Sequence, residues 1–167
     1  ISGIEFVPYL YKTRDIRSFL QLTQTEREES IRNNLFFNPE YRSDIKGKRV
    51  IVVEDSVVRG TNSPFGIQLL RDHGASEVDL LLASDMIGGN VDGREAFCNK
   101  GVAMSDPAAF ATTIHGRNPE KIAKGVGADF VGYLSILGML RSAGLEYDEA
   151  CLTCFNGIEF LPKLNLH

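Results

Sequence analysis

Two adjacent carboxylates, Glu54 and Asp55, follow a run of four β-branched residues at positions 50–53. Two neighbouring carboxylates can accept both hydroxyls of a ribose, or hold a divalent cation through oxygen ligands. The apolar run predicts a strand that is buried on both faces, as is typical of parallel sheets. Ligands of such sheets bind at the carboxyl ends of the strands, which is where this acidic pair would lie.

Residues 56–63, here called the phosphate loop, supply the chemistry of a phosphate site. Their successive backbone amides and hydroxyls are hydrogen-bond donors, and Gly60 lets the backbone approach a phosphate closely. Pro64 is expected to begin a helix, with Ser63 as its N-cap, whose positive end points into the loop. The candidate binding residues are therefore Glu54, Asp55, Ser56, Val57, Val58, Arg59, Gly60, Thr61, Asn62 and Ser63.

An ordinary strand, turn and helix with a solvated acidic pair is the simpler interpretation of this segment. However, the whole run of hydrophobic residues, acidic pair, small and hydroxyl residues, glycine and threonine resembles the signature of type I phosphoribosyltransferases. That resemblance implies a phosphoribosyl pyrophosphate site. Neither a GxGxxG nor a GxxxxGK[ST] pattern is present, which disfavours a dinucleotide-binding fold and a P-loop NTPase.

The composition is that of a globular domain, with 167 residues of which 43% are hydrophobic. A net charge of -4 disfavours nucleic-acid binding, and no apolar run approaches the roughly 20 residues that span a bilayer. We therefore expect a cytoplasmic protein with neither a nucleic-acid nor a membrane partner.

Strand and helix signals alternate along the chain, which predicts an α/β fold with a mainly parallel sheet flanked by helices. Residues 24–35 favour an exposed helix or a mobile loop. Strands are predicted at 49–53, 78–83 and 130–134, and helices at 64–73, after Asp106-Pro107, after Asn118-Pro119, and from Ser135 to Gly144.

With these elements placed, the chain resembles the C-terminal part of the glutamine phosphoribosylpyrophosphate amidotransferase family over nearly its whole length. The type I phosphoribosyltransferase fold is then expected for a single domain at 1–167 that forms the C-terminal portion of the fold and lacks its N-terminal part. The segments that carry the resemblance are Ser2-Gly3-Ile4, Lys12-Thr13-Arg14, Arg17-Ser18-Phe19, 24–35, 52–63, Gly127-Ala128-Asp129, Tyr133-Leu134-Ser135 and Cys154-Phe155-x-Gly157.

The resemblance implies an enzyme in which ammonia derived from glutamine displaces pyrophosphate from the sugar, giving phosphoribosylamine in the first step of purine synthesis. In that scheme Glu54 and Asp55 hold the ribose hydroxyls and magnesium (Mg2+), and residues 55–63 bind the 5-phosphate. Arg17, on a loop that closes over the substrate, helps to neutralise the departing pyrophosphate.

Parts of the family pattern are missing. The chain begins with Ile1 rather than the nucleophilic cysteine of the family's glutaminase, and the pyrophosphate-binding loop would lie before Ser2. We therefore expect a C-terminal piece of a longer enzyme, partnered by a glutaminase domain or subunit in a homo-oligomer.

Other positions depart from the family. Asn34 replaces a loop lysine, a glycine is deleted between Ile16 and Arg17, Leu137 replaces a glutamate, and residues 100–103 lack the family's tyrosine and acid. These departures leave two alternatives open. One is a non-catalytic regulator that binds phosphoribosyl pyrophosphate, and the other is a salvage phosphoribosyltransferase.

Cys151 and Cys154 form a CxxC pair, with Cys98 upstream. Alone, the pair indicates a redox site, half of a zinc site or two inert thiols. All three cysteines resemble ligands of the family subgroup that carries a 4Fe-4S iron-sulfur cluster, for which thiolates are the required ligands. That resemblance implies three of four cluster ligands in this chain, while zinc or no metal remains open.

Overall fold

The computed structural model describes residues 3–13, 23–60, 62–97 and 106–160. The strands, helices and contacts described for this chain lie within these ranges. Within them, no helix combines the length and the apolar character needed to cross a membrane.

A three-stranded parallel sheet forms the centre of the fold, with strand order β3-β4-β7. Its strands are β3 (Arg49–Glu54), β4 (Glu77–Leu82) and β7 (Phe130–Tyr133). Each β4 residue from Asp79 to Leu82 pairs with both neighbouring strands. The carboxyl ends of the three strands therefore meet at one edge, which confirms the predicted parallel α/β arrangement.

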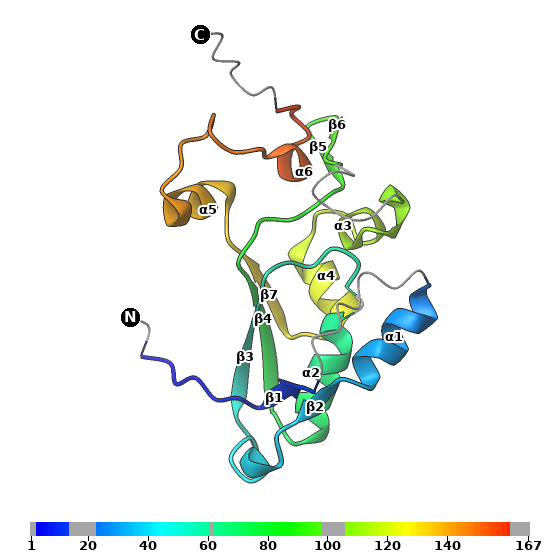
Figure 1. The fold of residues 1–167 in the computed structure, drawn as a ribbon, viewed down its shortest axis with the longest axis vertical. Coiled ribbons are helices and arrows are strands. Elements are labelled where there is room, and N and C mark those ends of the chain that lie inside the picture. Colours follow the sequence, from blue (N-terminus) through cyan, green and yellow to red (C-terminus); the bar gives the residue numbers. More distant parts are fainter. Residues whose placement is uncertain (1–2, 14–22, 61, 98–105, 161–167) are drawn as a thin grey trace.

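Two helices cover one face of this sheet, α2 (Asn62–Asp72) and α4 (Pro119–Val126) (Figure 1). The sequence signals of α4 are local and complete, because the Asn118 side chain accepts a hydrogen bond from the Lys121 amide and Gly127 ends the helix in the left-handed conformation. The main core lies between these helices and alternate residues of the strands, including Val50, Val78, Leu80, Leu82, Val131, Ile67, Leu70, Ile122 and Val126.

The opposite face of the sheet is open among the described residues. Val53 is 72% exposed, Leu81 37% and Phe130 52%. The prediction that residues 50–53 are buried on both faces was therefore wrong. Successive side chains of a strand point to opposite faces, and only the face that carries Val50 is packed against helices.

Shorter elements surround the sheet. Strands β1 (Leu10–Lys12) and β2 (Leu35–Phe37) pair antiparallel and flank α1 (Gln24–Arg32), so the segment at 24–35 begins as a helix and ends in a strand. The remaining elements are η2 (Pro39–Tyr41), β5 (Asn90–Val91), β6 (Arg94–Glu95), η3 (Pro107–Ala109), α3 (Ala111–Ile114), α5 (Ile136–Ala143) and α6 (Thr153–Asn156). Among these, α3, β5, β6 and α6 gather beyond the carboxyl ends of the strands, at the top of the view in Figure 1.

Helix α2 begins at Asn62, earlier than the proline signal predicts. Ser63 is consequently inside the helix rather than its N-cap. Its hydroxyl donates a hydrogen bond to the Glu54 carboxylate at 2.9 Å, so a contact with the sheet replaces the predicted capping bond.

Asp129 ties the start of β7 to both β4 and α2. Its Oδ2 accepts hydrogen bonds from the Val78 amide at 2.7 Å and from Nη2 of Arg71 at 2.8 Å. The Val78 hydrogen bond is the main reason that the pKa of Asp129 lies below its usual value, and Arg71 adds to the effect.

We expect Asp129→Ala to lower the free energy of unfolding at neutral pH by about 1 kcal/mol, because a charge-assisted hydrogen bond is lost but solvent screens the half-exposed carboxylate. A lowered folded pKa means that the stabilisation is present above about pH 4 and is lost as the pH falls through that pKa. Denaturant unfolding at several pH values measures both effects. Asp72→Ala removes an exposed carboxylate that accepts a hydrogen bond from Gln68 in the same helix, and it serves as the control. Equal losses of unfolding free energy in the two variants would contradict a stabilising role for the Asp129 hydrogen bonds.

Candidate functional site

The acidic pair lies at the carboxyl end of β3, as the sequence predicts. Glu54 is the last residue of the strand, and its carbonyl accepts a hydrogen bond from the Ala83 amide at 2.9 Å, just beyond the end of β4. Its side chain is half-buried, whereas that of Asp55 is exposed. One carboxylate is therefore fixed against the fold while the other faces solvent.

Burial raises the pKa of Glu54 above its usual value, and the nearby charge of Asp55 raises it further. The hydrogen bond from Ser63 and the positive charge of Lys12 act in the opposite direction. A half-buried carboxylate beside a second carboxylate is costly in an apolar setting. Such a carboxylate is well suited to accept hydrogen bonds from hydroxyl groups or to bind a cation.

The charge of Lys12 acts on Glu54, although the motif at 54–63 does not reveal it. Lys12 lies on β1, more than forty positions before the acidic pair. The only signal in the sequence is the Lys12-Thr13-Arg14 segment, which matches the family pattern without assigning Lys12 a role.

The first amide of the phosphate loop is hydrogen-bonded to the preceding residue, Asp55. Asp55 Oδ1 accepts hydrogen bonds from both the amide and the hydroxyl of Ser56. A phosphate that took the Ser56 amide would have to replace this contact, and the freed Asp55 carboxylate would then be available to a sugar hydroxyl.

The middle of the loop is held from two sides. Val57 is buried in the main core, and the Val58 carbonyl accepts a hydrogen bond from the Ala111 amide at 2.7 Å. Gly60 has φ of +71°, and a Cβ there would lie 3.2 Å from Val126 of α4. Both the backbone conformation and the contact with α4 therefore favour glycine here, and close approach to a phosphate stays a prediction.

The structure brings the acidic pair together with residues 56–60 and Ser63. Asn62 is placed as the first residue of α2, but its side chain is outside the description. The predicted roles of Arg17, Thr61 and Cys98 fall on residues outside the described ranges.

The two described cysteines lie at the start of α6, far along the chain from the acidic pair. Cys151 is exposed, with its Sγ 3.6 Å from Oγ1 of Thr153, and Cys154 is half-buried. No group of three His, Cys, Asp or Glu side chains suited to a metal ion occurs within the described part of the chain.

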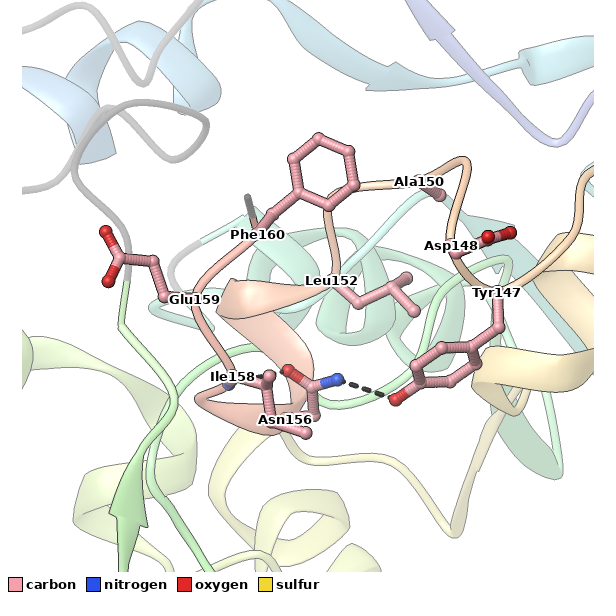
Figure 2. A pocket seen from close by; sticks show the side chains of 8 residues that line it. All are labelled: Tyr147, Asp148, Ala150, Leu152, Asn156, Ile158, Glu159 and Phe160. Carbon is pink, nitrogen blue, oxygen red and sulfur yellow. Dashed lines mark hydrogen bonds between the residues drawn. The ribbon is translucent and has the colours of Figure 1, made fainter. Parts of the chain in front are cut away.

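A cavity of about 260 Å³ lies in the C-terminal segment. Figure 2 shows Asn156 at its base, donating a hydrogen bond to the Tyr147 hydroxyl at 2.8 Å. Its lining residues are Tyr147, Asp148, Ala150, Leu152, Asn156, Ile158, Glu159 and Phe160, none of which belongs to the acidic pair or the phosphate loop.

Comparison with curated proteins identifies the relatives of this chain. The amidophosphoribosyltransferase of Methanothermobacter thermautotrophicus is 35% identical over 157 residues, and that of Bacillus subtilis is 34% identical over 161 residues. Glutamine phosphoribosylpyrophosphate amidotransferase from B. subtilis, solved in complex with ADP and GMP, matches the fold with a TM-score of 0.65 at 32% identity. The chain is homologous to amidophosphoribosyltransferases. A second solved structure, an allosteric regulatory enzyme of purine biosynthesis, matches with a TM-score of 0.66 at 31% identity.

The match to amidophosphoribosyltransferases covers most of this chain but a minor part of each relative. It includes 93% of this chain and 31% of both curated relatives, and 94% of this chain against 33% of the B. subtilis structure. No family model matches the chain. The resemblance stated from the sequence is confirmed for this portion.

Replacing Glu54 with Gln tests the cost of its buried charge. The amide oxygen can still accept the Ser63 hydrogen bond, so we expect Glu54→Gln to raise the midpoint of thermal unfolding at neutral pH. The cost applies only to the charged form of Glu54. Because burial raises its folded pKa, the wild-type side chain becomes protonated as the pH falls, and the difference in unfolding midpoint between the two proteins should disappear at about pH 4. Glu95→Gln, at an exposed position on β6, is the control. A Glu54→Gln protein less stable than wild type at neutral pH would show that the charge is not a net cost.

Proposed function

We propose that this chain binds 5-phosphoribosyl 1-pyrophosphate and forms the phosphoribosyl-transferring part of an amidophosphoribosyltransferase. The observation that carries the proposal is the acidic pair at the end of β3, joined to the phosphate loop through the Glu54–Ser63 hydrogen bond. The homology to amidophosphoribosyltransferases supports the same substrate.

In the proposed complex, the carboxylates of Glu54 and Asp55 accept hydrogen bonds from the two ribose hydroxyls. The 5-phosphate lies in the phosphate loop, where backbone amides and the positive end of α2 attract it. Asp55 exchanges its hydrogen bond with Ser56 for one with the sugar, so that sugar binding and phosphate binding proceed together.

The proposed reaction replaces pyrophosphate with ammonia. The nitrogen lone pair forms a bond to C1 of the ribose, the bond from C1 to the pyrophosphate oxygen breaks with its electron pair, and the added nitrogen loses one proton to give 5-phosphoribosylamine. Positive charge develops on the sugar as the leaving group departs. Carboxylates held beside the ring stabilise that charge, and Arg17 is proposed to neutralise the pyrophosphate.

The residues present fit a magnesium ion that is held jointly with the substrate. Mg2+ in such enzymes is bound by one or two carboxylates together with substrate phosphates rather than by an all-protein cage. The exposed Asp55 and the half-buried Glu54 supply two carboxylates. When bound, the ion would offset charge on the leaving pyrophosphate.

We also propose that Cys98, Cys151 and Cys154 are ligands of an iron-sulfur cluster, supported by their resemblance to the cluster-bearing subgroup. Iron-sulfur clusters are held by cysteine thiolates, and the exposure of Cys151 leaves its sulfur accessible. The ammonia is proposed to come from a glutaminase domain or subunit, within a homo-oligomer.

A second candidate is a regulator that binds the same substrate without turnover. Asn34 favours it, because this side chain stands where the family has a lysine and its amide donates to the Ser30 carbonyl at the end of α1. The side chain at this position therefore bonds the end of the helix, and it carries no positive charge that could bind phosphate oxygens.

Calorimetric titration with phosphoribosyl pyrophosphate and magnesium tests the proposed site on the longest native chain that contains this sequence. We expect saturable binding that weakens at least about 100-fold in the double variant Glu54→Ala, Asp55→Ala, because charged hydrogen bonds contribute about 1.5–3 kcal/mol each. Asp148→Ala with Glu149→Ala removes a second adjacent acidic pair and should bind like wild type. No binding by the wild-type chain, or equal losses in both double variants, would overturn the assignment.

Ammonia-dependent release of pyrophosphate separates the enzyme from the regulator. Turnover that is lost in the Glu54, Asp55 double variant supports the enzyme, whereas saturable binding without turnover supports the regulator. Incorporation of a purine or pyrimidine base in place of ammonia would indicate a salvage phosphoribosyltransferase.

Iron and sulfide analysis of anaerobically purified protein tests the cluster. We expect stoichiometric iron with broad visible absorbance, reduced by Cys151→Ser and by Cys154→Ser because each change removes a thiolate ligand. Stoichiometric zinc without iron would contradict the proposal.

A further inference from the structure

Arg117 holds the segment that follows β4 through two backbone carbonyls. Its Nη1 donates to the Met86 carbonyl at 2.9 Å and to the Gly88 carbonyl at 2.6 Å, while its Nη2 lies 3.7 Å from Asp85 Oδ1. The side chain is only 21% exposed. A single guanidinium therefore fixes a turn at the same sheet edge as the acidic pair.

Thr112 holds the same segment between those two contacts. Its Oγ1 donates to the Ile87 carbonyl at 2.6 Å, and the residue is 2% exposed. Gly88 has φ of +81°, and a Cβ there would lie 2.7 Å from the Phe110 ring. Three successive carbonyls at 86–88 thus receive side-chain donors from α3 and the loop after it, and Gly88 has no room for a side chain beside Phe110.

The same stretch of chain also holds the phosphate loop. The Ala111 amide donates to the Val58 carbonyl at 2.7 Å. The Val58 side chain packs against the small core formed by Ile87 and Phe110. Residues 110–112 consequently contact the turn at 86–88 on one side and the phosphate loop on the other.

Asp85 extends this arrangement to α5. Its Oδ1 accepts a hydrogen bond from the Met86 amide at 2.6 Å, and its Oδ2 accepts one from the Ile136 amide at 3.2 Å. Burial lowers the pKa of Arg117, and the charge of Asp85 opposes that effect. The carboxylate therefore offsets part of the cost of burying the guanidinium charge that bonds the two carbonyls.

We propose that Arg117 is a positioning residue for the phosphate loop. By fixing the turn at 86–88 against residues 110–112, it holds Val58, and with it residues 56–60, in the conformation that receives a phosphate. The inference rests on the proposed function, since it names a residue outside the binding motif that prepares the motif for its ligand. A loop that is ordered before binding gives higher affinity, because less conformational freedom is lost in the complex.

Arg71 provides a matched control at the other end of the sheet. Its Nη2 donates to the Gly127 carbonyl at 3.0 Å and to Asp129 at 2.8 Å, and it is 30% exposed. Both arginines thus join two elements through a backbone carbonyl and lie near a carboxylate. Lysine keeps the charge but cannot reproduce the forked donor geometry of arginine.

The experiment compares Arg117→Lys with Arg71→Lys by calorimetric titration of phosphoribosyl pyrophosphate with magnesium, and by hydrogen exchange of the amides at 57–60. We expect Arg117→Lys to weaken binding about tenfold and to speed exchange at these amides. Arg71→Lys should lower the thermal unfolding midpoint to a similar degree while leaving both readouts unchanged. Equal effects of the two variants on binding and exchange, or no effect of Arg117→Lys on either, would overturn the proposal.

The two readouts separate this inference from the proposed function. If the wild-type chain does not bind phosphoribosyl pyrophosphate, the proposed function fails, and the exchange comparison still decides whether Arg117 orders the loop. If Arg117→Lys does not fold, Thr112→Val takes its place. We then expect faster amide exchange and weaker binding in Thr112→Val. Both should recover in Thr112→Ser, which retains the hydroxyl. Unchanged exchange and binding in Thr112→Val would contradict the inference.

Discussion

The hydrogen bond between Glu54 and Ser63 is the contact on which the site depends. It joins the last residue of β3 to the first turn of α2, so the chain between them must close into a loop over the edge of the sheet. The bond also satisfies a carboxylate whose burial raises its pKa. Because burial disfavours the charged form of Glu54, this carboxylate does not stabilise the fold. The proposed role as a ligand group accounts for it, because functional groups are often retained at a cost in stability.

An element was predicted more accurately when the interactions that determine it join residues close together in the sequence. Helices with complete local signals, such as the one that begins after Asn118 and the one that ends at Gly144, were predicted closely because their caps lie within the segment itself. The three central strands were predicted to within one residue at either end for a similar reason, since each consists mainly of apolar residues within one short segment. The start of α2 was wrong because the bond from Ser63 to the sheet depends on a strand nine residues earlier. The short strands β1, β2, β5 and β6 were not predicted, because two or three residues carry too little periodicity to identify a strand without its partner.

The same distinction applies to the site. Glu54, Asp55 and the phosphate loop are contiguous, so their residue types and order are sufficient to locate them in the sequence. Lys12 and Arg117 act across long separations in the chain, the first on a carboxylate of another strand and the second on carbonyls about thirty positions away. Backbone carbonyls are present at every position and give no sequence signal. A side chain that positions a loop through carbonyls is therefore visible only in the folded structure.

Electrostatics explain why such positioning matters at this site. Phosphoribosyl pyrophosphate is a polyanion, and the acidic pair would repel it unless cations and oriented amides compensate. Lys12 already lowers the pKa of Glu54 against the effect of burial, and a magnesium ion would act in the same direction. The amides of the phosphate loop can contribute only if they converge on one point, since a dipole loses most of its effect when it is misaligned. The hydrogen bond from Ala111 to the Val58 carbonyl, supported from behind by Arg117, restrains the backbone that carries these amides. Negative charge on the protein and on the proposed substrate can thus occupy adjacent positions because the intervening backbone is held in place before binding.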